Sequence, residues 1–319
     1  MSRPRVVFMG TPEFAVPSLQ AVAASCDVVA VVTQPDRPRG RGLAHESSAV
    51  ARCAESLGCG VMKPADMKSD GVRGELAALA PDLFAVVAFG AILTPELLAV
   101  PRLGAINLHG SLLPEYRGAS PVQRVLWDGR KTTGVTTLWM DHEIDTGDVI
   151  LAREVPIAED DDAGSLAARL AALGAPLLAD SLQMAFEGRA PRVPQDRARG
   201  SYAGKMTKAD GIVDWSLGAE SVWHRQRAVT PWPGSSTTFR GRPVRLERTR
   251  VASAVGRAAE PGTVVAVAEP GVDVACGSGS LRIVKLKPEG RALLDAAAWA
   301  RGVRLEDGER FESLRKAQA

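Results

Sequence analysis

Residues 5–33 read RVVFMGTPEFAVPSLQAVAASCDVVAVVT, with two apolar runs on either side of a turn and a helical segment. The runs at 5–9 and 27–33 are short and rich in β-branched residues, which is typical of strands buried on both faces of a parallel sheet. Gly-Thr-Pro at 10–12 marks the turn, and apolar periodicity over 14–24 predicts a helix. This order of strand, turn, helix and strand indicates an α/β unit.

The same alternation continues over the first two hundred residues. Further buried strands are predicted at 82–89 and 104–109, a pair of strands flanking a turn at 132–141 and 148–155, and helices at 72–79, 119–127 and 163–186. We therefore predict a doubly wound α/β domain over residues 1–187.

The composition changes after this domain. Residues 187–199 read EGRAPRVPQDRAR, which lacks apolar periodicity and indicates a linker, placed at 188–207. Beyond it, a helix is predicted at 219–228 and short strands at 236–239, 244–250, 262–268, 271–276 and 280–286. Evenly spaced short strands with Gly and Pro turns predict a small β-barrel domain over 208–319.

Composition and charge bound the function. The chain has 319 residues, 45% hydrophobic and 24% charged, which excludes a disordered chain, a collagen-like repeat and a coiled coil. Residues 204–319 hold 19 Lys and Arg against 13 Asp and Glu, whereas the rest of the chain holds 20 against 24. A basic C-terminal third is compatible with a polyanionic partner such as nucleic acid, and equally with a basic domain that has no such partner.

No membrane span and no metal site are expected. The longest charge-free apolar run, at 83–93, is about half the length that crosses a bilayer, and the N-terminus has no apolar stretch typical of a signal peptide. The four cysteines show no CxxC spacing, so neither a zinc site nor a disulfide framework is indicated, and we expect a cytoplasmic protein. Residues 34–47, QPDRPRGRGLAHES, predict a long polar surface loop available for function.

The most informative stretch is 105–121, AINLHGSLLPEYRGASP. Asn107 and His109 are two apart on a predicted strand, so their side chains point to the same face at the end where α/β sheets bind ligands. An amide beside an imidazole offers two N–H donors to one oxygen, as a developing oxyanion needs.

An acidic turn follows at 141–148, DHEIDTGD. A carboxylate from this turn near His109 would orient the imidazole and favour its protonated form. Taken alone, His109 fits a structural strand-end histidine, and the turn fits a solvated or a divalent-metal loop. Together the two segments indicate an acyl-transfer site.

These two segments resemble the formyltransferases that use 10-formyltetrahydrofolate. The resemblance implies that Asn107, His109 and Asp145 form the catalytic trio. It also implies that the formyl donor is bound by the SLLP segment and by residues near the acidic turn: Ser111, Leu112, Leu113, Pro114, Phe89, Gly90, Asp141 and Glu143.

The rest of the chain resembles the branch of that family whose acceptor is initiator methionyl-tRNA. The matching segments are FMGTPEFAVP at 8–17, TQPDRPRGRG at 33–42, YAGKMTKADGIVDW at 202–215 and PWPG at 231–234. This likeness implies a Rossmann-like catalytic domain followed by an OB-like β-barrel. It also implies tRNA contacts by Arg41, assisted by Arg37 and Arg39, and by Lys205 and Lys208. The loop departs from the family pattern at 43–45, where Leu-Ala-His replaces a basic pair and a proline.

Several alternatives stay open. The acceptor could be another amine, such as an amino sugar or glycinamide ribonucleotide, although a small acceptor needs neither the basic C-terminal third nor the Arg-bearing loop. Water could be the acceptor, which would make the chain a folate-dependent hydrolase. A tRNA-binding protein with an inactive site is the alternative from outside the enzymes. We expect a monomer.

Other conspicuous residues are expected to have ordinary roles. His45 and His142 are predicted to be exposed and His224 to be structural. Trp215, Trp223 and Trp232 are predicted to pack within the fold, and Cys276 is predicted to lie in a core strand.

Overall fold

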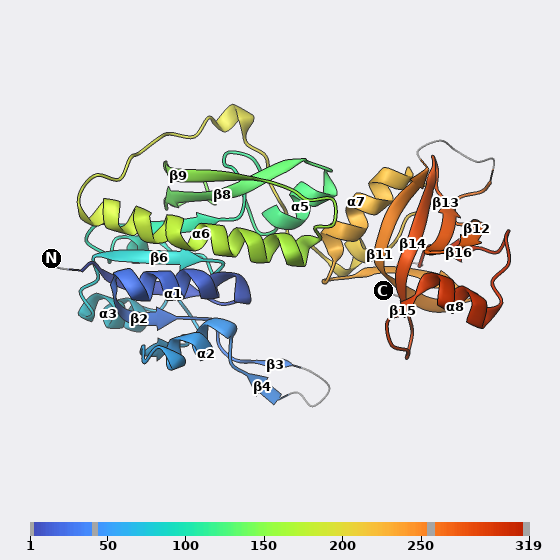
Figure 1. The fold of residues 1–319 in the computed structure, drawn as a ribbon. Helices are drawn as coiled ribbons and strands as arrows, with labels where there is room; N and C mark the ends of the chain where they lie inside the picture. The colour runs from blue at the N-terminus through green and yellow to red at the C-terminus, as the bar shows by residue number, and fades with distance from the viewer. Residues whose placement is uncertain (1–2, 40–43, 254–258, 315–319) are drawn as a thin grey trace. The chain divides into compact units, whose positions relative to one another are not determined.

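The structure, a computed structural model, describes residues 3–39, 44–253 and 259–314. Its contacts divide the chain into two units (Figure 1). The N-terminal unit comprises Met1–Gly118, Thr132–Pro156 and Ala167–Ala203, and the C-terminal unit comprises Ala119–Lys131, Ile157–Leu166 and Gly204–Ala319. Two short segments that precede residue 167 thus belong to the C-terminal unit.

The N-terminal unit is built on a seven-stranded sheet in the order β5-β2-β1-β6-β7-β8-β9. Its strands are β1 (Arg5–Gly10), β2 (Asp27–Val32), β5 (Val61–Met62), β6 (Leu83–Val87), β7 (Ala105–His109), β8 (Thr132–Trp139) and β9 (Val149–Pro156). The strands from β5 to β7 are parallel, and all five residues of β6 are buried. The predicted Rossmann-like, doubly wound domain is confirmed.

The last two strands of the sheet are antiparallel. β8 pairs antiparallel with β7 and with β9. The predicted pair of strands flanking a turn is found as β8 and β9, which are antiparallel because a short turn can join only antiparallel neighbours. β9 lies at the edge of the sheet and is largely exposed.

The strand order reverses at β1. The chain proceeds from β1 outward to β2 and β5, then returns to the other side of β1 with β6 and β7. In open α/β sheets, ligands bind at such a reversal, outside the carboxyl ends of the strands. Here Thr11, just after β1, donates from Oγ1 to the carbonyl of Phe89, just after β6, at 2.9 Å.

Eight α-helices are assigned in the described parts of the chain. They are α1 (Val16–Ser25), α2 (Ala49–Ser56), α3 (Asp70–Ala78), α4 (Pro95–Leu98), α5 (Pro121–Trp127), α6 (Ala163–Phe186), α7 (Ala219–Val229) and α8 (Ala296–Val303). The sequence did not predict α2, although Ser48 caps its N-terminus by accepting from Ala51 N at 3.0 Å. It did not predict α8 either.

The two faces of the N-terminal sheet are covered differently. Alternate residues of β1, β2, β6 and β7 pack with Leu76 of α3 and Leu97 of α4 in one apolar cluster. On the opposite face, α6 lies against β7 and β8 (Figure 1). There Gly174 allows α6 to approach Leu108, and Ser181 bonds Thr137 at 2.7 Å.

Helix α6 was predicted as part of the α/β domain, and no membrane span was expected. By length and composition alone, its 24 residues are nevertheless long and apolar enough to cross a membrane. Core helices of soluble proteins pass the same test, and half of its most apolar window is buried inside the protein.

The segment predicted as a loop at 34–47 contains a hairpin instead. β3 (Arg37–Arg39) pairs antiparallel with β4 (Ala44–Glu46), with Arg37 opposite Glu46. Arg41 lies outside the described residues. The base of the hairpin is tied to β5 because Lys63 Nζ donates to Asp36 Oδ1 at 2.7 Å and to Ser47 Oγ at 3.0 Å.

The C-terminal unit is a curled antiparallel sheet in the order β12-β13-β14-β11-β10-β16, with β15 beside β14. Its strands are β10 (Ser235–Phe239), β11 (Arg242–Ser253), β12 (Val264–Ala268), β13 (Gly271–Ala275), β14 (Ser280–Pro288), β15 (Leu294–Asp295) and β16 (Phe311–Glu312). Three register shifts between β11 and β14 bend these long strands. The predicted OB-like barrel is confirmed as a half-barrel, and all five predicted strands are present.

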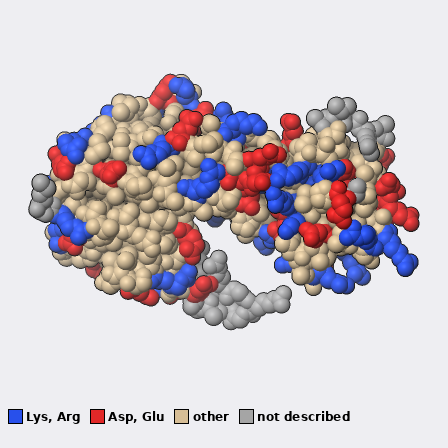
Figure 2. All heavy atoms as spheres, viewed as in Figure 1, with Lys and Arg blue, Asp and Glu red and all other residues tan. Residues whose placement is uncertain are grey.

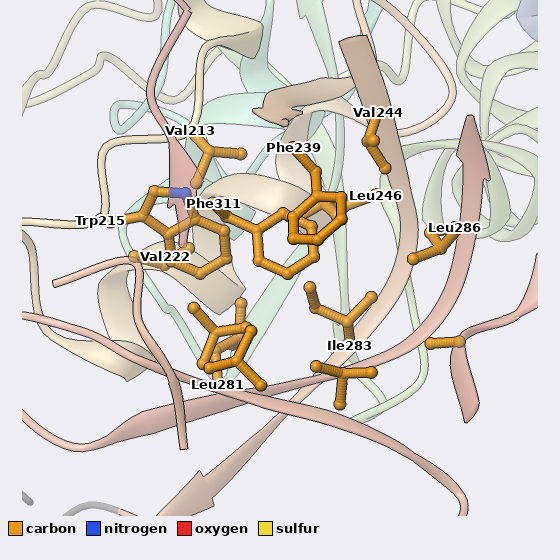
Figure 3. Packing of buried hydrophobic residues seen from close by; sticks show 14 of the residues in the cluster. Val213, Trp215, Val222, Phe239, Val244, Leu246, Leu281, Ile283, Leu286 and Phe311 are labelled. Atoms are coloured by element: carbon orange, nitrogen blue, oxygen red, sulfur yellow. The ribbon is translucent and has the colours of Figure 1, made fainter. Parts of the chain in front are cut away.

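Aromatic and aliphatic side chains fill this half-barrel (Figure 3). Phe311 of β16 lies at its centre, with ring centroids 5.1 Å from Phe239 and 6.1 Å from Trp215. Trp215 and Cys276 are buried there, as predicted, and burial raises the pKa of the Cys276 thiol to about 12. The prediction that Trp232 packs within the fold is wrong, because Trp232 is 53% exposed at the Pro-Trp-Pro turn.

Candidate active site

The carboxyl end of β7 places Asn107 and His109 on one face of the sheet. They share this face with Ala105, which belongs to the apolar cluster beneath α3 and α4. Asn107 is partly exposed, whereas the side chain of His109 is 6% exposed. The amide is therefore the more accessible of the two groups.

Asp145 joins the two side chains. Its Oδ1 accepts from Asn107 Nδ2 at 3.0 Å, and its Oδ2 lies 3.4 Å from His109 Nδ1. Oδ2 also accepts from the backbone N–H of Gly118 at 2.8 Å. The three residues predicted to be catalytic are thus brought together, and the carboxylate is 12% exposed.

Both ring nitrogens of His109 face acceptors. Nε2 lies 2.8 Å from the carbonyl oxygen of Tyr116, and because a carbonyl only accepts, Nε2 carries a proton. Nδ1 faces the Asp145 carboxylate, which is an acceptor for a proton held there. The 3.4 Å distance from Nδ1 to Oδ2 is long for a charge-assisted hydrogen bond, so this is the weaker of the two contacts that the ring makes.

The loop after β7 is held by hydrogen bonds between side-chain hydroxyls and its backbone. Ser111 is fully buried, and its Oγ donates to the carbonyl of Glu115 at 2.7 Å. Thr136 of β8 donates to the Ser111 carbonyl at 2.7 Å and accepts from Leu113 N at 3.2 Å. Leu112, Leu113 and Pro114 are partly exposed. In this geometry Ser111 shapes the loop, and the three following residues are the ones a ligand can reach.

The other residues predicted to hold the formyl donor divide into two groups. Phe89 is 3% exposed and packs in the apolar cluster with Leu93, whereas Gly90 is exposed at a φ of +82° with open space around it. Asp141 stays inside the acidic turn, where its carboxylate accepts from Glu143 N at 3.0 Å and Thr146 Oγ1 at 2.8 Å. Glu143 lies 3.3 Å from Arg197 in an exposed ion pair.

A pocket of about 260 Å³ opens beside the acidic turn. It is lined by turn residues between 139 and 148, Asp141 among them, and by linker residues between 192 and 197. Two exposed isoleucines, Ile92 and Ile144, lie within three residues of predicted donor-binding positions. Exposed side chains of this size are suited to covering an apolar ligand.

The described residues that were predicted to bind tRNA are divided between the two units, and those on β3 share the unit of the trio. Arg37 and Arg39 lie on β3 of the N-terminal unit. Lys205 and Lys208 are exposed in the C-terminal unit, the latter in the 3₁₀ turn Lys208–Gly211. Lys and Arg side chains lie beside Asp and Glu side chains on the viewed face of that unit (Figure 2).

The other histidines, cysteines and acidic residues form neither a metal site nor a disulfide among the described residues. No group of three or more His, Cys, Asp or Glu side chains among the described residues could hold a metal ion. The four cysteines are free thiols. His142 is exposed as predicted, and burial with Arg227 nearby lowers the pKa of His224 below its ordinary value.

Sequence reasoning missed three residues that hold the site. Gly118, with a φ of +110°, supplies the N–H on Asp145, and Tyr116 supplies the carbonyl on His109. Gln195, in the segment interpreted only as a linker, donates to the carbonyls of Asp145 and Gly147. No local signal distinguishes a clamping glutamine from a solvated one, because its partners are about fifty residues away.

The chain matches known families along most of its length. A family model described as formyl transferase matches residues 4–182, and one described as formyl transferase, C-terminal domain, matches residues 205–304. The methionyl-tRNA formyltransferase of Geobacter metallireducens is 44% identical over 307 residues, covering 96% of this chain and 98% of that protein. That of Moorella thermoacetica is 42% identical over 308 residues, with 96% and 98% covered.

The fold is shared with more distant enzymes. The crystal structure of WlaRD, a sugar 3N-formyl transferase, superposes with a TM-score of 0.67 at 15% identity and covers 92% of this chain and all of that one. At that identity the likeness concerns the fold alone. The family is shown by the relatives that are 42–44% identical over 96% of this chain and by the two family models. The chain belongs to the formyl transferase family and, within it, to the methionyl-tRNA formyltransferases.

Proposed function

We propose that the protein transfers the formyl group of 10-formyltetrahydrofolate to the α-amino group of methionine on initiator methionyl-tRNA, giving formylmethionyl-tRNA for translation initiation. Relatives 42–44% identical over almost the whole chain support the acceptor. The observation that carries the chemistry is the Asp145 carboxylate shared by Asn107 and His109.

The reaction requires an oxyanion site and a place for one proton. The neutral amine nitrogen attacks the formyl carbon, a C–N bond forms, and the carbonyl electron pair moves onto oxygen. Asn107 keeps one Nδ2 proton on Asp145 and has a second one to donate to the oxyanion. His109 donates from Nδ1 and adds its positive charge.

Collapse of the oxyanion breaks the bond between the formyl carbon and N10 of the donor. Asp145 accepts the proton that the attacking amine loses, directly or through a water, and N10 leaves with this proton when Asp145 passes it on by the same route. No covalent enzyme intermediate is needed. The same carboxylate therefore orients the donors and receives the proton.

The formyl donor fits the residues around this site. Phe89 and its apolar neighbours offer a wall for a flat ring, and the partly exposed Leu112, Leu113 and Pro114 lie on the loop next to the trio. We assign donor binding to these residues together with Gly90, Ser111, Asp141 and Glu143, Ser111 acting through the shape of its loop.

We assign the acceptor to the basic residues Arg37, Arg39, Arg41, Lys205 and Lys208. In this proposal residues 1–187 are the catalytic domain, 188–207 the linker and 208–319 the tRNA-binding domain. The enzyme works as a monomer in the cytoplasm without a metal or a membrane partner, in line with four free thiols. Sedimentation of the purified chain tests the monomer.

The function is tested by formyl transfer to charged initiator tRNA with 10-formyltetrahydrofolate, beside an uncharged-tRNA control. Formylmethionyl product that depends on the esterified amine is expected. Product with glycinamide ribonucleotide or an amino sugar instead would contradict the acceptor. Formate release without an amine would indicate a hydrolase, and no turnover with intact tRNA binding would indicate an inactive binding protein.

A further inference from the structure

Gln195 makes four hydrogen bonds although it lies in the Pro- and Arg-rich linker. Its Nε2 donates to the carbonyls of Asp145 at 2.9 Å and Gly147 at 2.7 Å. Its Oε1 accepts from Arg117 Nε at 3.1 Å and from the Arg117 Nη2 at 2.8 Å. Two acceptors on one side and two donors on the other leave one orientation of the amide that satisfies every partner. Pro194 and Asp196, on either side, are exposed.

The backbone that Gln195 holds is an unusual one. Asp145 has a φ of +56°, in the left-handed region that a residue with a side chain rarely adopts. Such a conformation persists only where the surroundings impose it. Gln195 donates to the carbonyls of Asp145 and Gly147, so it restrains the turn from which the Asp145 carboxylate projects.

The other side of the carboxylate is held by the same linker. Tyr116 N donates to Ser201 Oγ at 2.8 Å, Arg117 N donates to the Ser201 carbonyl at 2.9 Å, and Ala203 N donates to the Arg117 carbonyl at 2.6 Å. These bonds order the loop whose Gly118 N–H lies on Asp145 Oδ2. Arg117 connects the two attachments, since its backbone pairs with 201–203 and its side chain binds Gln195.

We propose that Gln195 and Arg117 form a strap that positions the Asp145 carboxylate for catalysis, and that the linker between 195 and 203 is therefore part of the active site. This inference rests on the proposed function. The segment lies between the ranges that the two family models match, 4–182 and 205–304, so neither match assigns it a role. Gln195 is a positioning residue that acts through Asp145.

The Gln195→Glu variant separates the contact of residue 195 with Arg117 from its contacts with the carbonyls of the acidic turn. A glutamate keeps an oxygen for Arg117 but has no hydrogen for the carbonyls of Asp145 and Gly147, and it brings a negative charge to them. If contact with Arg117 alone mattered, this variant would behave as the wild type. If the turn must be held, kcat falls on the order of 10²-fold while KM for both substrates stays within about twofold.

The matched control is Gln183→Ala on α6. Gln183 loses an amide in the same unit, but that amide donates to Glu187 at 2.7 Å and not to the acidic turn. Gln195→Ala and Arg117→Ala complete a double-variant cycle. Because both act on the same turn, the double variant is expected to lose no more activity than the worse single variant.

A signal independent of activity comes from Asn107, which is the only asparagine in the sequence. Protein labelled with [¹⁵N]asparagine gives one pair of side-chain amide signals, from the Nδ2 that donates to Asp145 Oδ1 at 3.0 Å. We expect these signals to move in Gln195→Glu and Gln195→Ala and to stay in place in Gln183→Ala.

The outcomes separate this proposal from the proposed function. Unmoved Asn107 signals together with wild-type kcat in Gln195→Glu overturn the strap, and a rise in KM at unchanged kcat overturns it as a catalytic device. A wild-type protein that formylates no acceptor overturns the proposed function, whereas the Asn107 signals still decide whether Gln195 positions Asp145.

Discussion

Asp145 is the residue on which the site depends, because one carboxylate receives the Asn107 amide, the Gly118 N–H and the His109 ring. Charge-assisted hydrogen bonds are stronger than neutral ones, so the carboxylate orients these partners before any substrate arrives. One Nδ2 proton of Asn107 is donated to Asp145, and among the described residues the second has no partner. In the proposed mechanism this second proton is the one donated to the oxyanion.

Replacing Asn107 with Ala removes that donor. We expect kcat to fall by about 10²–10³-fold, or about 2.7–4 kcal/mol of transition-state stabilisation, which is the range for the loss of one oxyanion donor. Binding of the formyl donor, measured by calorimetry, and the melting temperature report whether the site is otherwise intact. An unchanged kcat would remove Asn107 from the mechanism.

At the scale of elements, close approach decides where glycine is needed. A Cβ on Gly134 of β8 would lie 2.5 Å from Leu112 Cδ2 and would also meet the carbonyl of Arg153 on β9. Gly74 in α3 has nothing within 4 Å of the same hypothetical atom. A Cβ therefore has no room at Gly134 and open space at Gly74, so replacement by alanine is expected to have opposite effects at the two positions.

Gly134→Ala is expected to destabilise the protein by about 1–3 kcal/mol, since it overpacks the sheet beneath the loop that carries Leu112. Gly74→Ala is expected to stabilise it by about 0.5–1 kcal/mol through helix propensity. Urea unfolding of both variants gives the two free energies. Equal effects would show that the contact beneath Leu112 is unimportant.

Helix α7 carries a histidine that resists protonation. Burial, with Arg227 and Lys131 adding positive charge, lowers the pKa of His224 below its ordinary value of 6.5. Its Nδ1 has no hydrogen-bond partner among the described residues. The unfolded chain therefore takes up this proton at a higher pH than the folded chain.

Neutral His224 therefore contributes fully to the free energy of unfolding above about pH 6.5, the pKa of histidine in the unfolded chain. This contribution is lost as the pH falls through the lowered pKa of the folded chain. His224→Gln removes this loss, so its free energy of unfolding is expected to fall less than that of the wild type between pH 7.5 and 5.5. The limit for one proton is about 1.4 kcal/mol per pH unit. His142→Gln, at a side chain that is 72% exposed, serves as the control. Parallel pH profiles of wild type and His224→Gln would contradict the assignment.

At the scale of the whole molecule, the proposed catalytic trio and the basic C-terminal third belong to different units. The trio lies in the N-terminal unit, and residues 204–319 of the C-terminal unit carry 19 basic against 13 acidic side chains. A tRNA substrate is bound largely through its phosphates, and this part of the affinity falls as salt displaces it. The proposed acceptor therefore implies a salt dependence.

Lys205→Ala and Lys208→Ala are each expected to lower tRNA affinity and to reduce the slope of log affinity against log salt by about 0.7–0.9. Arg41→Ala should weaken tRNA use and leave binding of the formyl donor unchanged. Filter binding between 50 and 200 mM salt, conditions in which such slopes are measurable, tests the three variants. Lys68→Ala, at an exposed lysine of the N-terminal unit, is the control. Slopes equal to that of the wild type would exclude these lysines from the interface.

The elements that the sequence predicted are those with strong periodicity. β1, β2, β6, β7, α6 and the five strands of the half-barrel were found within a few residues of their predicted bounds. The elements α2, α4, α8, β5, β15, β16 and the β3–β4 hairpin were not predicted, because they have neither the continuous apolar run of β6 and β7 nor the long apolar periodicity of α6, and they depend on contacts elsewhere in the chain. Trp232 shows the same limit, since an apolar residue type does not decide its own burial.

The sequence by itself determined the alternation of strand and helix, and it placed Asn107 and His109 on one face, because a strand has a period of two. It also supplied the acidic turn and the basic C-terminal third. Local pattern did not decide which carboxylate meets the imidazole: the family resemblance named Asp145, and the tertiary structure brings it there. Asp145 is 38 residues from Asn107, and it arrives because β8 and β9 fold back antiparallel and Gln195 and Gly118 hold the left-handed turn. Those contacts join segments distant in sequence, so no local periodicity or propensity encodes them.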